Sequence, residues 1–274
     1  MKWPGEHCYF STMDSVHGLI CIEDLNSNTP LVWNPSTGQL LLLPKPPNMN
    51  SKYINVFLGY DPVQGKHKVV CLPYEKTSHF FRVFTLRSGQ ESWRTVGTHN
   101  LKHKCRGYGS DRCINGVIYY LASGQGYNTF IMSFNVRFEI FSMIELPSGN
   151  FQDVLISYKG KLACVDRYNE TRLLILEDAY KHKWSFQNFL FPLYMWNLKD
   201  SSEEPNLFKL KGCTYDGEFI YVPYGDHNNR SYIIFYDPVR NSCRRLKFEG
   251  LVDEEKFGFK LHVFPNHIES IVSL

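Results

Sequence analysis

Short apolar runs, each closed by a turn residue, follow one another along almost the whole chain. The runs are rich in β-branched and aromatic residues and end at Gly, Pro, Asn or Asp, which predicts β-strands. Helical periodicity is nearly absent. Many runs are apolar throughout instead of alternating, and such runs predict strands that are covered on both faces. These continuous runs are residues 40–43, 69–72, 117–121, 173–176 and 232–236.

The predicted strands group in fours. Successive units repeat at about 45 residues, a period typical of propeller blades. A blade packs between two neighbours, which explains strands that are apolar on both faces, and radial closure protects the strand edges. The strands are expected at 10–16, 19–23, 30–33 and 39–44; 56–61, 66–73, 80–86 and 92–96; 111–114, 117–122, 130–136 and 140–147; 155–158, 161–166, 172–178 and 184–191; and 211–215, 218–223, 232–237 and 243–248.

The pattern therefore predicts an all-β fold: a single β-propeller with kelch-like four-stranded blades, formed by residues 1–274 as one domain. Five blades are clear. Residues 260–264 and 267–274 are strand-like but have no unit of their own, so we expect them to form a partial or closing sixth blade, either with residues 1–10 or with upstream sequence. The competing interpretation is a β-sandwich or β-barrel.

Three turns between apolar strands begin with Asn or Asp followed by Pro, at Asn34, Asp61 and Asp237. The side chain at the first turn position accepts hydrogen bonds from the backbone, and Pro fixes φ at the next position. We interpret these turns as scaffold.

Composition and charge narrow the function classes. The chain has 274 residues, is 43% hydrophobic and carries a formal net charge of +3, without the broad basic character of a nucleic-acid binder. No apolar run approaches the roughly 20 residues of a membrane span. The N-terminus has no apolar signal segment, so the eight scattered cysteines are predicted to be reduced core residues. A cytoplasmic or nuclear protein is expected, with no nucleic-acid or membrane partner.

The segment THNLKHKCRGYGSDRC contains four residue types that bind zinc, at His99, His103, Cys105 and Cys113. Its spacing fits no common zinc pattern, and its Lys and Arg residues disfavour a dication. We therefore predict a solvated loop between blades, with no metal and no cofactor.

Catalytic signatures are also missing from the sequence. Acidic residues fall mostly at turns or in polar loops, where they do not form the carboxylate pair of a glycosidase. No Gly-x-Ser-x-Gly elbow, phosphate loop or His-Glu-x-x-His motif is present. Trp33, Trp93 and Trp184 lie in apolar strands and are predicted to pack in the core. The chain is therefore not predicted to be an enzyme, although a site assembled from several blades is an open alternative.

The links between strands differ in length within each unit. Links one-to-two and three-to-four are mostly short turns, whereas the other links are longer and share one face of the fold. Elaborated loops on a rigid scaffold are how binding surfaces are built, and Tyr and Arg are enriched at interface hot spots. Coincidence is the competing explanation in a chain with 17 tyrosines. The predicted partner-binding residues are Tyr74, Tyr127, Arg167, Tyr168, Tyr224 and Arg230.

Six motifs stand in the order seen in plant F-box-associated domains: HGLICI, VWNPSTGQLLLLP, LGYDPVQGKHKVV, VFTLRSGQESWRTV, RCINGVIYYLAS and IMSFNVRFEIFSMIELP. The chain resembles the type 3 F-box-associated β-propeller from about His17 to its C-terminus. This resemblance implies a propeller that recruits protein substrates to an SCF-type ubiquitin ligase. Too few residues precede His17 for a helical F-box, so binding of a Skp-type adaptor and cullin is expected only if an F-box is supplied.

The resemblance and the residues together predict a non-enzymatic protein-recognition module that resembles the substrate-receptor half of an SCF ligase, with an unidentified protein substrate on the long-loop face. The alternative is a propeller enzyme that acts on small molecules.

Overall fold

The structure, a computed structural model, is built from β-strands and turns, and no helix occurs among the residues it describes. The chain divides into two compact units, Met1–Gly149 with Ala179–His182 and Asn266–Leu274, and Asn150–Asp178 with Lys183–Pro265. The described residues are 8–10, 14–24, 26–49, 53–74, 77–87, 89, 92–98, 101–106, 111–124, 129–147, 151–166, 172–188, 208–223, 232–247 and 262–274.

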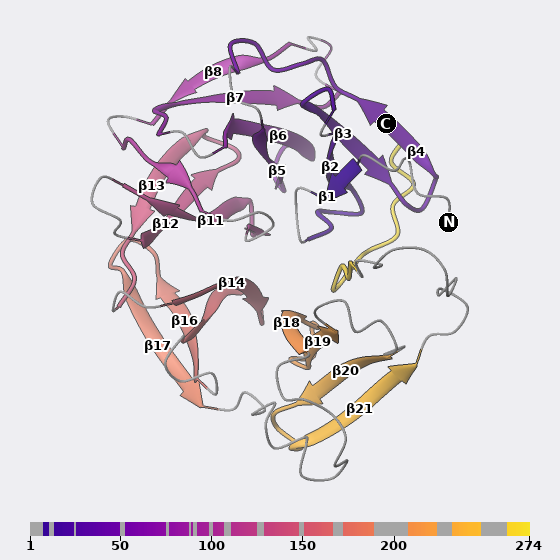
Figure 1. Ribbon diagram of the computed structural model, residues 1–274, viewed down its shortest axis with the longest axis vertical. Coiled ribbons are helices and arrows are strands. Elements are labelled where there is room, and N and C mark those ends of the chain that lie inside the picture. The colour runs from indigo at the N-terminus through magenta and orange to yellow at the C-terminus, as the bar shows by residue number, and fades with distance from the viewer. Residues whose placement is uncertain are drawn as a thin grey trace. The chain divides into compact units, whose positions relative to one another are not determined.

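The first unit holds three antiparallel sheets, each made of consecutive strands (Figure 1). The first sheet has the order β1(Cys8–Phe10), β2(Ile20–Asp24), β3(Thr29–Asn34) and β4(Gln39–Leu42). The second has the order β5(Ile54–Asp61), β6(Lys66–Pro73), β7(Phe80–Thr85) and β8(Arg94–Gly97). The third has the order β10(Arg112–Ile114), β11(Val117–Ser123), β12(Thr129–Asn135) and β13(Ile140–Ile144), and β9(Lys104–Cys105) pairs with β11.

The second unit holds two sheets of the same kind. One has the order β14(Phe151–Tyr158), β15(Lys161–Asp166), β16(Arg172–Asp178) and β17(Lys183–Asn188). The other has the order β18(Phe208–Cys213), β19(Phe219–Pro223), β20(Tyr232–Asp237) and β21(Ser242–Lys247). The five four-strand groups predicted from the sequence are therefore confirmed.

Within each unit, the hydrophobic core lies between consecutive sheets. In the first unit, Val56 and Val69 of the second sheet pack in one buried cluster with Cys21 and Val32 of the first sheet. On the other side, the second and third sheets share another cluster, in which the Phe57 and Tyr120 rings stack 4.7 Å apart. In the second unit, buried residues of β14–β16 pack against those of β18–β20. Strands of the sheet interior are thus covered on both faces, as their unbroken apolar runs predict.

The fourth strand of a sheet differs from the interior strands. The run at 40–43 was expected to be covered on both faces, but Leu40 is 41% and Leu42 62% exposed in β4. The expectation fails because β4 is the last strand of its sheet, with described partners only in β3. Leu43, just beyond the strand, is buried in the core, and the partly buried Leu41 packs against the same cluster.

The first predicted strand is displaced. The strand expected at 10–16 is β1 at Cys8–Phe10, which pairs with β2. Residues 14–19 instead make a tight turn, in which Val16 bridges Leu19 and both His17 (φ +47°) and Gly18 (φ +82°) have left-handed backbone conformations. A strand cannot continue through two such residues.

The expected closing sixth blade is not formed by the described C-terminal residues. Residues 262–274 contain no strand, and β1 belongs to the first sheet. Residues 260 and 261 lie outside the described part of the chain. The C-terminal residues 266–274 instead form an irregular segment that belongs to the first unit.

The His- and Cys-containing segment is not the solvated loop that its charge predicted. His103 is fully buried and Cys105 is 4% exposed, in a short strand that pairs with β11. The His103 Nδ1–H donates to the Leu101 carbonyl (2.7 Å), which leaves Nε2 to accept from the Tyr120 hydroxyl (2.7 Å). His103 is therefore a core residue with both ring nitrogens occupied by protein partners. His99 lies outside the described residues.

The three tryptophans are less buried than predicted. Trp33, Trp93 and Trp184 are all of intermediate exposure. Trp184 lies on β17, the last strand of its sheet, and Trp33 on β3 pairs with Leu40 of the last strand β4. Trp93 packs against Phe84 at a centroid distance of 5.2 Å, and its indole N–H donates to the Pro44 carbonyl (2.7 Å). Trp93 thus covers the edge of the core instead of filling it.

Within the described residues there is no helical segment of the length and apolarity needed to cross a membrane.

Candidate functional site

The predicted partner-binding residues fall mostly outside the part of the chain that the structure describes. Five of the six lie outside the described residues: Tyr127, Arg167, Tyr168, Tyr224 and Arg230. Tyr74 is described, at the end of β6, and is half-buried. Its backbone N–H donates to the Tyr53 carbonyl (3.1 Å), and its ring meets the Tyr53 ring edge-on at 6.3 Å. Tyr74 is thus fixed against the start of β5, with part of its surface open.

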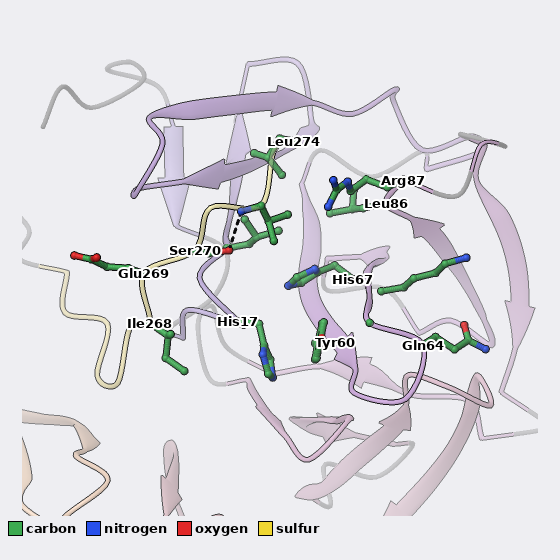
Figure 2. Close-up of a pocket in the computed structure, with 14 residues that line it drawn as sticks. His17, Tyr60, Gln64, His67, Leu86, Arg87, Ile268, Glu269, Ser270 and Leu274 are labelled. Atoms are coloured by element: carbon green, nitrogen blue, oxygen red, sulfur yellow. Dashed lines mark hydrogen bonds between the residues drawn. The ribbon is translucent and has the colours of Figure 1, made fainter.

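A cavity lies at the opposite end of the second sheet from Tyr74. Its volume is about 580 Å³, within the range of roughly 300–1,000 Å³ that is typical of ligand sites. The turn between β5 and β6 and the turn after β7 supply one side, and the C-terminal segment supplies the other (Figure 2). The lining residues used below are His17, Tyr60, Lys66, His67, Arg87 and Ser270.

Three rings form an aromatic wall of this cavity. The His17 ring stacks on Tyr60 at a centroid distance of 3.7 Å, and the His67 ring lies tilted against Tyr60 at 4.8 Å. Tyr60 and His67 face each other because they are paired across β5 and β6. His17 reaches them because the tight turn before β2 carries it outward in a left-handed conformation.

Both imidazoles on this wall are neutral at pH 7. Burial lowers the pKa of His67 to about 4, and partial desolvation lowers the pKa of His17 below its usual 6.5. A neutral His67 donates its Nε2–H to the Val16 carbonyl (3.0 Å). Its Nδ1 then keeps a lone pair, so this ring adds a hydrogen-bond acceptor to the wall.

Two cationic side chains, Lys66 and Arg87, line the same cavity and are exposed. Neither is seen in a hydrogen bond or ion pair with another described residue. Arg87 has a left-handed backbone (φ +58°) in the turn after β7. The acidic residue of the lining, Glu269, is also exposed, and Figure 2 shows its side chain directed away from Arg87. The charge that faces the cavity is therefore positive.

The C-terminal segment is held in place by side chains of the first sheet. The Asn34 amide, fully buried, donates to the carbonyls of Ser270 (3.0 Å) and Val272 (2.7 Å). The Ser270 backbone N–H donates to the Ser36 hydroxyl (3.0 Å). Gly18 allows close approach, since a Cβ there would lie 2.2 Å from the Cβ of Ser270. The opposite wall of the cavity is therefore fixed by specific contacts.

This arrangement places groups of complementary chemistry around one cavity. Among the described residues, no three His, Cys, Asp or Glu side chains are grouped to hold a metal ion. The cavity offers hydrogen-bond donors on Lys66 and Arg87, an acceptor on His67, and ring faces on His17 and Tyr60. Such a set suits an anionic group attached to a partly apolar body.

Sequence reasoning missed these residues because they are far apart along the chain. The lining comes from a turn at His17, the two turns of the second sheet, and residues 268–274. Two segments of the sequence, HGLI and GYDPVQGKHK, hint at the site, because each places imidazole or aromatic residues beside a turn. Nothing local indicates that the C-terminal residues complete the site.

Antiparallel sheets of four consecutive strands, repeated in chain order, define the class of β-propellers. The chain belongs to the F-box associated beta propeller domain family, whose profile matches residues 1–268. The resemblance drawn from the sequence motifs is thereby confirmed.

Two relatives come from Arabidopsis thaliana. The protein named "Putative F-box protein At3g10240" is 50% identical, over 100% of this chain and 70% of its own length. The protein named "Putative F-box protein At1g47790" is 46% identical, over 100% of this chain and 72% of its own length. Among solved structures, a luciferin-regenerating enzyme matches with a TM-score of 0.51 and 10% identity, over 88% of this chain and 78% of that chain. That likeness shows the fold alone.

Proposed function

We propose that this protein is a non-enzymatic recognition module that serves as the substrate receptor of an SCF-type ubiquitin ligase. The observation that carries the proposal is the family match over residues 1–268, with relatives named as F-box proteins that align along the whole chain. In this role the propeller binds a protein substrate. A Skp-type adaptor and a cullin join through an F-box, in the cytoplasm or nucleus.

The geometry supports a binding role. Each sheet is a rigid platform, because interior strands are buried on both faces, and binding residues are commonly carried by loops on such scaffolds. We keep Tyr74, Tyr127, Arg167, Tyr168, Tyr224 and Arg230 as the proposed contact residues of the longer loops between strands. Tyr74 supports this in one respect: its ring packs against Tyr53, and the residue is only partly buried.

The proposal is tested by affinity purification of three baits from plant cells: this chain, this chain fused behind an F-box, and the F-box alone. The fusion and the F-box alone should both recover the adaptor and the cullin. A set of proteins should be recovered by both baits that contain the propeller, and by neither the F-box alone nor an unrelated propeller. Those proteins should be ubiquitylated only with the fusion.

The result that would overturn the proposal is equally defined. The receptor role fails if the propeller recovers no protein beyond the unrelated propeller control. It also fails if the proteins recovered by the fusion are not ubiquitylated in a reconstituted reaction. If the receptor role holds, alanine variants of Tyr74 and of the five other proposed contact residues should fold like the parent. The variants that lose the substrate then identify the contact.

A further inference from the structure

The cavity of the first unit lies at the turn end of the second sheet, away from the loop that carries Tyr74. We propose that it is a second binding site, which takes the acidic side chain of a protein segment, with the carboxylate held by Arg87 and Lys66. The inference rests on the proposed function in one respect, namely that the ligand is a protein. The predicted tyrosine loops play no part in it.

The hydrogen-bond donors of the cavity are the first evidence for an acidic ligand. Arg87 and Lys66 are exposed, line one side, and are not seen in an ion pair with any described residue. An arginine holds a carboxylate through two parallel hydrogen bonds, and a lysine adds a point charge. Glu269 does not supply the missing anion, because its side chain is directed away from Arg87 (Figure 2).

The aromatic wall of the cavity is the second piece of evidence for an acidic side chain as the ligand. The stacked His17 and Tyr60 rings present an uncharged surface beside the cations, and this surface suits the methylene groups between a carboxylate and its backbone. The Nδ1 of neutral His67 can accept a backbone N–H from the bound segment. An acidic side chain on a peptide therefore satisfies both the donors and the acceptor.

The rim of the cavity indicates what stands beside the acidic residue. On the C-terminal wall, the lining residue Ile268 is 51% exposed. The lining residues Val272 and Leu274 of the same segment are partly exposed. Exposed aliphatic side chains beside a charged cavity favour a ligand whose acidic residue has apolar neighbours.

The cavity is held open before a ligand arrives. Its C-terminal wall is fixed by the two hydrogen bonds from Asn34, and its other wall consists of turns attached to buried strands. A site of this kind binds without first ordering its own residues, which lowers the entropic cost of binding.

The test is selection from a phage-displayed library of random peptides on the intact chain. Enriched peptides should share an Asp or Glu with apolar neighbours. Synthetic copies, measured by fluorescence anisotropy, should lose affinity when that residue becomes Gln or Asn, and should bind more weakly at higher salt because the contact is a partly exposed ion pair.

Two double variants locate the contact. Lys66→Ala with Arg87→Ala should weaken binding by about tenfold or more, the scale of a hot-spot loss. Lys45→Ala with Arg137→Ala removes the same charge from two other exposed positions of the first unit that do not line the cavity, and should leave affinity unchanged. Equal losses in the two variants, no loss in either, or no enrichment of acidic peptides would overturn the inference.

The outcome is separable from that of the proposed function. If the F-box fusion recovers proteins that become ubiquitylated but no acidic peptide is enriched on the chain, the receptor role stands and the acidic site is wrong. If acidic peptides bind at the cavity but no protein bound by the chain is ubiquitylated, the acidic site stands and the receptor role is wrong.

Discussion

Single side-chain oxygens organise the turns of this protein. The predicted role of the first turn residue is confirmed at Asn34, Asp61 and Asp237, whose Oδ1 atoms accept the backbone N–H two residues on at 3.0, 2.9 and 2.8 Å. Asn135, which no proline follows, makes the same bond at 3.1 Å. The oxygen is therefore the shared element of these turns, and the proline is an addition.

Asn34 has a second task that its turn motif does not reveal. Asn34→Asp keeps the oxygen that holds the turn but replaces the amide group that donates to Ser270 and Val272. Because the site is fully buried, we expect a loss of about 1–3 kcal/mol in the free energy of unfolding, measured in urea. The matched control is Asp237→Asn at a partly exposed turn, which should stay within about 0.5 kcal/mol. Equal effects at the two positions would show that Asn34 is turn scaffold only.

Glu23 makes stability depend on pH. It is 1% exposed and accepts the Ile54 N–H (3.2 Å), and burial raises its pKa from 4.5 to about 7. Because the folded pKa lies above the unfolded one, its stabilising contribution is complete below about pH 4.5 and is lost as pH rises through 7. Glu23→Gln cannot ionise, so the variant should gain stability over the parent as pH rises, by up to about 3 kcal/mol.

The measurement is the difference in free energy of unfolding between parent and Glu23→Gln, taken at intervals from pH 5 to pH 9. Other titrating groups, such as His67, are present in both proteins and cancel in the difference. A constant difference across the range would mean that Glu23 is ionised throughout.

Among the elements, the strands follow from local sequence and the C-terminal segment does not. The second to fifth strand groups begin and end within a few residues of their predicted bounds, because Gly, Asn, Asp and Pro mark each turn directly. The first strand and residues 262–274 depart from prediction. Their conformations depend on left-handed residues at 17–18 and on contacts between Asn34 and Ser270, which lie 236 positions apart.

The contact between Gly18 and the C-terminal segment can be tested with a matched glycine. Gly18 (φ +82°) and Gly38 (φ +72°) both require a left-handed backbone, but a Cβ on Gly38 meets no atom within 4 Å. Gly38→Ala should therefore cost only the backbone term of about 1–2 kcal/mol. Gly18→Ala should cost more, because its Cβ would lie 2.2 Å from the Ser270 Cβ and 2.8 Å from the Ile268 carbonyl.

Ser270→Gly provides the second arm of that experiment. It removes the nearer of the two clashing atoms, so it should recover part of the stability lost in Gly18→Ala when the two changes are combined. If Gly18→Ala and Gly38→Ala cost the same free energy of unfolding, the C-terminal segment does not press on Gly18.

For the whole molecule, class and family could be predicted but the cavity could not. The repeat of four strands and the order of six motifs extend over most of the chain. Many weak local patterns therefore agree on the same fold class and family. The cavity has no such support, because His17, Tyr60, Arg87 and Ser270 come together only after two sheets and the C-terminal segment have folded. The predicted tyrosine loops stay a prediction, tested only by the binding experiments proposed above.

Cysteine chemistry provides a last prediction for the whole chain. None of the seven cysteines whose side chains the structure describes forms a disulfide, and five of them are buried. Burial raises the pKa of Cys113 and of Cys213 to about 12, and it also raises the pKa of Cys71 and of Cys105 well above the usual thiol value. Since the thiolate is the reactive form, a thiol reagent at pH 8 should label the native protein slowly.

After denaturation without reductant, the same reagent should count all eight cysteines of the sequence. The order of native labelling is also fixed, since Cys113 and Cys243 are partly exposed and should react before the buried five. Cys243 should react first of these two, because its pKa is raised above 9.0 while that of Cys113 reaches about 12. A count of six in the denatured protein would reveal a disulfide and contradict the predicted reduced core.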